Sequence, residues 1–146
     1  MFDETARGFS VKEFEERLKK VQKLMDKNDI AGILLMTEPE VRYFSGFHTA
    51  FWQSPTRPWF LYIAVDKKPT AIIPEIGALL MRSTWIEDVR TWHAPYPIDD
   101  GMSLLEELLE PLSKSKSRLG IMKGHETNLR MPLGDYEKLT SKLSGI

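Results

Sequence analysis

The sequence has no cysteine among its 146 residues, which excludes disulfide bonds, a thiol nucleophile and a thiolate metal site. No apolar stretch approaches the roughly 18 residues that a transmembrane helix needs. The first ten residues lack a basic region followed by an apolar core, so no secretory signal is predicted and the cytoplasm is the expected location. The formal net charge is −1, from 20 basic and 21 acidic residues, which argues against nucleic acid or an anionic membrane as a partner.

The motifs of familiar catalytic and nucleotide sites are also missing. No G-x-G-x-x-G or G-x-x-x-x-G-K-[ST] follows a predicted strand, and residues 44–46 are a helix end rather than a nucleophile elbow. None of the histidines, His48, His93 and His125, is paired with another metal ligand at helical spacing. The adjacent carboxylates Asp99 and Asp100 are more simply interpreted as a helix N-cap. The sequence therefore contains no complete catalytic or metal site.

The composition that is present, 42% apolar and 28% charged residues, is typical of one globular domain, which we expect to span residues 1–146. Two helix starts are marked by capping-box spacing, Ser10 with Glu13 and Thr37 with Glu40. Phe9 and Phe14 flank the first of these at the positions of a hydrophobic staple.

Hydrophobic periodicity predicts alternating helices and strands. Helices are expected at residues 11–27, 38–45, 75–82, 102–112 and from 132 onward, with strands at 31–36, 59–65, 70–74, 88–92 and 118–122. The polar turn at residues 66–69 joins its two strands as an antiparallel hairpin, so the sheet must be mixed. Pro111 should kink or shorten the helix that contains it. We therefore predict an α/β fold with three layers, α/β/α, around a mixed sheet.

One aromatic loop, residues 47–58, stands between the second helix and the second strand. It contains Trp52, His48 and a single cation, Arg57. Pro58 restricts the backbone of Arg57 to extended conformations, and a guanidinium with aromatic neighbours suits a carboxylate or carbonyl ligand. The alternatives are that Arg57 pairs with an acid to fix the loop and that His48 is a structural histidine.

Several segments in order resemble one known family. These are the F-x-x-R-L of residues 14–18, the apolar strand at 31–36, P-E-V-R-Y-F-S-G-F at 39–47 and W-I-E-D-V at 85–89. Together they resemble the N-terminal domain of the creatinase, prolidase and aminopeptidase P enzymes. The most specific of them is the stretch at 39–47, which resembles the family's P-E-N-I-R-Y-L-T-G-F. The resemblance runs from about residue 9 to the end and implies a mixed, ribonuclease-H-like sheet.

The resemblance also implies which functions to expect. In this family a C-terminal pita-bread domain, absent from this chain, holds two divalent metal ions of the Mn or Zn type, so no catalytic or metal residue is carried over. The N-terminal domain contributes to a homodimer and shapes the partner subunit's substrate site. In creatinase-like members, an aromatic-x-Arg segment before the second strand reaches across the dimer to the substrate carboxylate. Arg57 matches its arginine, although Pro55 and Thr56 replace the aromatic residue and glycine, so the aromatic role could pass to Trp52.

We therefore expect the non-catalytic domain of a dimeric Xaa-Pro peptidase, inactive by itself, with Arg57, Trp52 and His48 as substrate-binding candidates. Two alternatives stay open. The parent enzyme could instead hydrolyse creatine or a cyclic amidine such as ectoine. The chain could also be a catalytically inactive module that binds a peptide or protein on the same scaffold.

Overall fold

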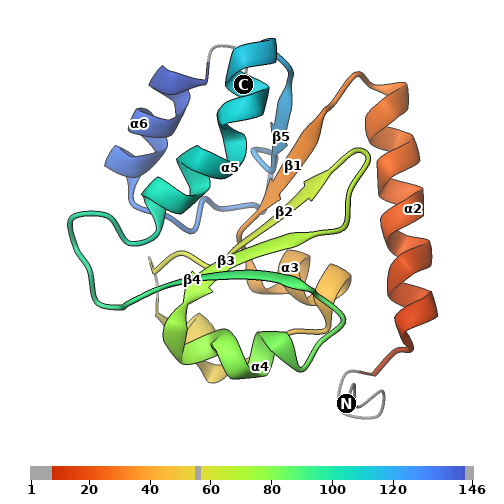
Figure 1. Ribbon diagram of the computed structural model, residues 1–146, viewed down its shortest axis with the longest axis horizontal. Helices are drawn as coiled ribbons and strands as arrows, with labels where there is room; N and C mark the ends of the chain where they lie inside the picture. The colour runs from red at the N-terminus through yellow and green to blue at the C-terminus, as the bar shows by residue number, and fades with distance from the viewer. Residues whose placement is uncertain (1–7, 55–56, 144–146) are drawn as a thin grey trace.

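The strands form one mixed sheet in the order β4-β3-β2-β1-β5 (Figure 1). The computed structural model describes residues 8–54 and 57–143. Its strands are β1 (Gly32–Leu35), β2 (Phe60–Ala64), β3 (Thr70–Pro74), β4 (Asp88–Trp92) and β5 (Leu119–Ile121). Its helices are α2 (Val11–Lys27), α3 (Glu38–Ser45), α4 (Ala78–Arg82), α5 (Met102–Ser115) and α6 (Leu133–Lys142), with 3₁₀ turns η1 (Ala50–Gln53) and η2 (Glu75–Gly77).

The sheet combines both kinds of strand pairing, as the predicted hairpin requires. β2 pairs antiparallel with β3 and with β1, whereas β4 lies parallel to β3 and β5 lies parallel to β1. β4 and β5 are the edge strands, and β4 is the more exposed of the two, in agreement with its alternating sequence.

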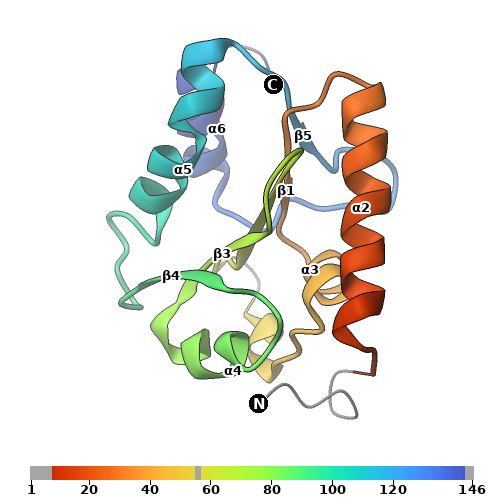
Figure 2. The ribbon, with the colours of Figure 1, turned by 45° about the vertical axis from the view of Figure 1, so that its right-hand side comes forward.

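Helices cover both faces of the sheet, which confirms the predicted three layers. Figure 2 shows α2 on one side of the strands and α5 and α6 on the other. Successive side chains of a strand point to opposite faces, so Leu61 and Ile63 of β2 pack with Phe14 of α2, while Phe60 and Tyr62 pack with Leu105 of α5. Every residue of β2 and β3 is buried for this reason.

Local sequence signals fix the helix boundaries closely. Ser10 Oγ accepts a hydrogen bond from the Glu13 amide at 3.3 Å, and the rings of Phe9 and Phe14 meet at 6.1 Å. The expected shortening at Pro111 is wrong, because α5 continues to Ser115. A proline removes only one helical donor, and the apolar face of α5 stays buried against the sheet. Among the described helices, none has the length and apolar character needed to cross a membrane.

Candidate functional site

The ends of α3 determine where the aromatic loop begins. Glu40 Oε2 accepts hydrogen bonds at 3.0 Å from the amides of Met36 and Thr37, which fixes the first turn of the helix. At the other end Gly46 adopts a left-handed conformation with φ of 71°, and its amide donates to the Arg42 carbonyl at 2.8 Å. A side chain at position 46 would be strained, so glycine is required for the chain to turn into the loop.

A cluster of aromatic rings anchors the loop to the core. Trp59 is fully buried, and its ring centroid lies 5.5 Å from that of Phe47 and 5.8 Å from that of Trp52. Phe51 stacks on the outer side of Trp59 at 6.3 Å and is half-exposed. Such packing anchors the described part of the loop to the core.

Arg130, on the segment between β5 and α6, binds the backbone of the same loop. Its guanidinium donates to the carbonyl oxygens of Arg57 at 2.8 Å, of Trp52 at 3.1 Å and of Ser54. Its Cζ atom lies 4.8 Å from the centroid of the Trp52 ring, in cation–π geometry. This residue was not predicted from the sequence. No local pattern marks Arg130, and its contacts span 73 to 78 positions along the chain.

Arg57 is half-buried and lies three residues before the start of β2. Within residues 8–54 and 57–143, no carboxylate forms an ion pair with its guanidinium. The alternative role for Arg57, an ion pair that fixes the loop, therefore finds no partner among the described residues. The preceding Pro55 and Thr56, where the resemblance departs from the family pattern, lie outside the described residues.

The other two candidates occupy different environments. The Trp52 side chain is buried, and its indole Nε1 has no hydrogen-bond acceptor among the described residues. His48 is exposed, with its Nε2 atom 3.4 Å from Glu38 Oε1. Trp52 and Arg57 are thus joined through Arg130. Glu38 acts on two of these side chains. It lies beside His48, and its charge also acts on the guanidinium of Arg130.

Metal binding gains no support from the part of the chain that the structure describes. No group of three or more histidine, aspartate and glutamate side chains is placed there to hold an ion. His93 forms only a pair with Glu75, at 3.2 Å.

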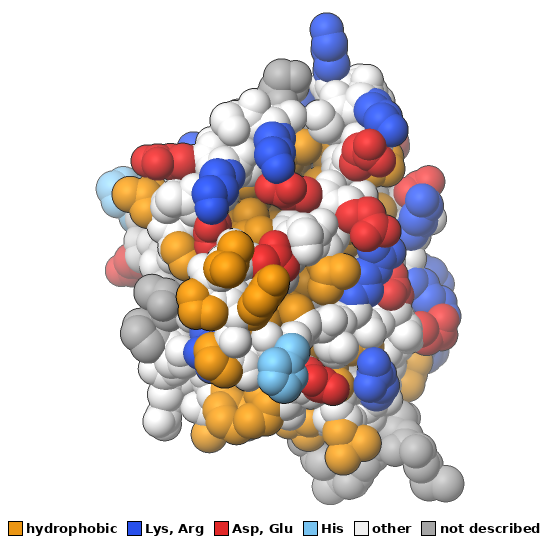
Figure 3. Space-filling view, turned by 60° about the vertical axis from the view of Figure 1, so that its left-hand side comes forward, with side chains coloured by type: hydrophobic (Ala, Val, Ile, Leu, Met, Phe, Trp, Pro, Cys, Tyr) orange, Lys and Arg blue, Asp and Glu red, His pale blue; other side chains and the backbone are white. Residues whose placement is uncertain are grey.

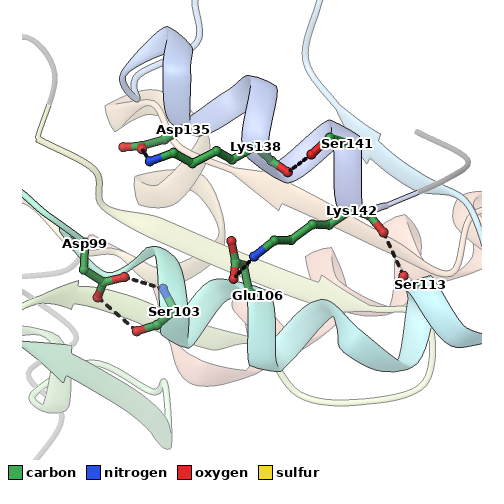
Figure 4. A network of polar contacts seen from close by, with 8 residues as sticks. All are labelled: Asp99, Ser103, Glu106, Ser113, Asp135, Lys138, Ser141 and Lys142. Atoms are coloured by element: carbon green, nitrogen blue, oxygen red, sulfur yellow. Dashed lines mark hydrogen bonds and ion pairs between the residues drawn. The ribbon is translucent and has the colours of Figure 1, made fainter.

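Asp99 and Asp100 are turn and cap residues, as the simpler interpretation predicted. Asp99 accepts hydrogen bonds from the amide and hydroxyl of Ser103 at 2.7 and 2.9 Å (Figure 4), and Asp100 accepts one from the Tyr96 amide at 3.1 Å. Figure 4 also shows Lys142 of α6 bridging to Glu106 and Ser113 of α5. These polar contacts connect two helices and resemble no catalytic arrangement.

Comparison with solved structures shows the same fold in peptidase domains. A proline dipeptidase from Streptococcus pneumoniae aligns with a TM-score of 0.67 and 14% identity, covering 88% of this chain and 86% of that one. The N-terminal domain of an X-Pro dipeptidase from Streptococcus pyogenes aligns with a TM-score of 0.67 and 14% identity, covering 89% of each chain. A prolidase from Thermococcus sibiricus aligns with a TM-score of 0.69 and 20% identity, covering 88% of this chain but only 32% of the prolidase.

A search of curated proteins gave no match. The family comparison is decisive, because the family model described as creatinase/prolidase N-terminal domain matches residues 17–146. That range contains all of the sheet, the aromatic loop and Arg130. The chain belongs to the creatinase/prolidase N-terminal domain family.

Proposed function

We propose that this chain is the N-terminal, non-catalytic domain of a dimeric metal-dependent hydrolase that cleaves Xaa-Pro peptides. Its membership of the family and its likeness in fold to structures described as proline dipeptidases and prolidases support the reaction class. The chain spans about a third of the Thermococcus prolidase, so catalysis and two divalent metal ions of the Mn or Zn type are assigned to a separate domain. This domain helps to shape the substrate site of the partner subunit.

One observation carries the proposal: Arg57 is a cation on an anchored loop with no acidic partner among the described residues. The Arg57 side chain is only half-buried, so its guanidinium can form charge-assisted hydrogen bonds to an anion or carbonyl group from outside the chain. A peptide carboxylate accepts two parallel hydrogen bonds from such a fork. Trp52 and His48 flank the site in this proposal, with Trp52 as its buried support and His48 as an exposed contact.

A second surface supports the dimer. We call Ile76, Leu79, Tyr96 and Ile98 the apolar face; Leu79 is 86% exposed and Ile98 is 84% exposed. Figure 3 shows hydrophobic side chains gathered on this side of the molecule. His93 Nδ1 lies 3.2 Å from Glu75 Oε2, and this contact joins its two segments. Exposed apolar groups that gather on one face are typical of protein contacts, and in this proposal the contact is with a second copy of the protein.

Replacing Arg57 tests the proposal. In a protein that joins this domain to its catalytic domain, Arg57→Ala should raise KM for a proline dipeptide about tenfold to a hundredfold, the worth of a hydrogen bond to a charged group. Arg57→Lys should recover part of the loss, because it keeps the charge but not the fork. The matched control is Arg42→Ala, which removes an equal charge from the exposed surface of α3 and should leave KM unchanged.

Two outcomes would contradict the proposal. Unchanged kinetics in Arg57→Ala would return Arg57 to a structural role. Hydrolysis of a proline dipeptide by the 146-residue chain alone, with Mn²⁺ or Zn²⁺ and no other protein, would show that the catalytic groups lie within it. Saturable binding of a folded protein by an inactive full-length parent would favour the alternative of a binding module.

A further inference from the structure

Arg130 is a buried cation whose partners in the described residues are neutral. Its side chain is 6% exposed, and its hydrogen bonds go to carbonyl oxygens of the aromatic loop. Burial lowers the pKa of the guanidinium from its ordinary value, and the charge of Glu38 opposes this effect. A guanidinium still keeps its proton at neutral pH, because its ordinary pKa lies far above neutrality. The loop carbonyls therefore surround a permanent positive charge.

The placement of these contacts matters more than their number. Trp52 and Ser54 precede the undescribed pair 55–56, and Arg57 follows it. One rigid fork thus holds the backbone at Trp52 and Ser54 and also at Arg57, the residue whose side chain we assign to substrate. A lysine offers no planar fork and could not reproduce this set of contacts.

We propose that Arg130 is a positioning residue for Arg57: it fixes the loop backbone around Arg57 and adds a second positive charge, which forms no ion pair among the described residues and favours an anionic ligand. This inference rests on the proposed function, since it assumes that Arg57 contacts substrate. Arg130 itself touches no substrate in this account. Its effect on binding passes through the loop geometry and through the field of its charge.

Arg17 supplies a matched comparison elsewhere in the fold. It is also buried, and it donates to the Tyr43 carbonyl at 2.7 Å. Its Cζ lies 4.0 Å from the Phe9 ring centroid, so its stacking is like that of Arg130. The difference is that Glu13 neutralises Arg17 at 2.9 Å. Losing Arg17 should therefore cost stability without changing the aromatic loop.

Amide hydrogen exchange in the 146-residue chain tests the geometric part. The probes are the amides of Trp52 and Ser54, which bond to the carbonyls of Thr49 and Phe51. Arg130→Met should speed their exchange about tenfold or more beyond any change in global stability, because a hydrogen bond to a charged group is lost. Arg17→Met should change them only in step with global stability. Guanidinium ion added to Arg130→Ala should restore part of the protection.

Equal loop exchange in Arg130→Met and Arg17→Met, after correction for global stability, would overturn the inference. Arg130→Lys guards against a variant that fails to fold, because it keeps the charge and should show an intermediate rate. The same loop rate in Arg130→Lys and the unmodified chain would also count against the fork.

Kinetics of the full-length protein separate this inference from the proposed function. Arg130→Lys should raise KM several-fold with little change in kcat. In a protein that already carries Arg57→Ala, Arg130→Lys should raise KM by a smaller factor than it does in the unmodified protein. If Arg57→Ala leaves KM unchanged, the proposed function fails, whatever the exchange data show for Arg130. If Arg57→Ala raises KM while Arg130→Lys and Arg130→Met leave both KM and loop exchange unchanged, only the present inference fails.

Discussion

Tyr62 is a residue whose ionisation is coupled to folding. It lies 6% exposed in β2, and its ring covers Gly32 of β1 so closely that a Cβ at position 32 would come within 2.5 Å of the ring and hydroxyl. Burial, with a smaller contribution from the charge of Asp66, raises the pKa of Tyr62 from 10.0 to about 12. The folded protein therefore holds this proton more tightly than the unfolded chain does.

The sign of the pH effect follows from that shift. The stabilisation is complete below pH 10, where tyrosine in both states is protonated, and it is lost as the pH rises from 10 to about 12. We predict that the unmodified protein loses about 2–3 kcal/mol more of its free energy of unfolding over this interval than Tyr62→Phe does. Denaturant unfolding of both proteins at a series of pH values measures the difference. A difference that stays constant up to pH 12 would show that Tyr62 ionises normally.

Arg57 and Arg130 differ in how far the sequence could identify them. Arg57 stood out because it is the single cation among the aromatic residues of its loop. The burial of Trp52 and the contacts of Arg130 were not predictable, since they depend on a segment more than 70 positions away. Local patterns report short-range contacts, whereas buried arginines are determined by the tertiary structure.

At the scale of single elements, the start of α5 depends on a glycine. Gly101 precedes the helix with φ of 85°, and a Cβ there would lie 2.5 Å from the indole Nε1 of Trp92. Gly134, in the first turn of α6, has no positive φ, and a Cβ added there would meet no heavy atom within 4 Å. The same substitution should therefore have opposite effects at the two positions.

We predict that Gly101→Ala lowers the free energy of unfolding by about 2–4 kcal/mol, from left-handed backbone strain and from overpacking against Trp92. Gly134→Ala, the matched control, should be neutral or stabilise the protein by up to about 1 kcal/mol, because alanine is the better helix former. Denaturant midpoints of the two variants give the test. Equal effects at both positions would mean that neither the contact with Trp92 nor the positive φ is important.

Elements with strong local signals were predicted almost to the residue. The capping residues Ser10 and Glu40 form their predicted hydrogen bonds, and Gly46 ends α3. Pro111 was the exception, because the penalty for a proline inside a helix competes with burial of the apolar face of α5, and burial prevails. Sequence shows the cost of the proline but not the packing that offsets it.

At the scale of the whole molecule, the mixed sheet places the aromatic loop where two distant parts of the chain meet. The hairpin of β2 and β3 was predictable from its polar turn, but the parallel pairing of β5 with β1 was not. Pairing across more than 80 positions leaves no local trace, since either edge of the sheet could have accepted the last strand. The pairing of β5 with β1 therefore brings the β5–α6 segment to the loop, and Arg130 makes the contact.

In the proposed enzyme, Arg57 of one subunit acts in the substrate site of the other. The most direct measurement is the KM of hybrid dimers of the full-length protein, in which one subunit carries Arg57→Ala and the other carries a disabled catalytic domain but native Arg57. The only working active site then belongs to the Arg57→Ala subunit, and the intact arginine can reach it only from its partner. We expect KM for a proline dipeptide to return to the value of the unmodified enzyme. A KM that stays as high as in the Arg57→Ala homodimer would contradict it.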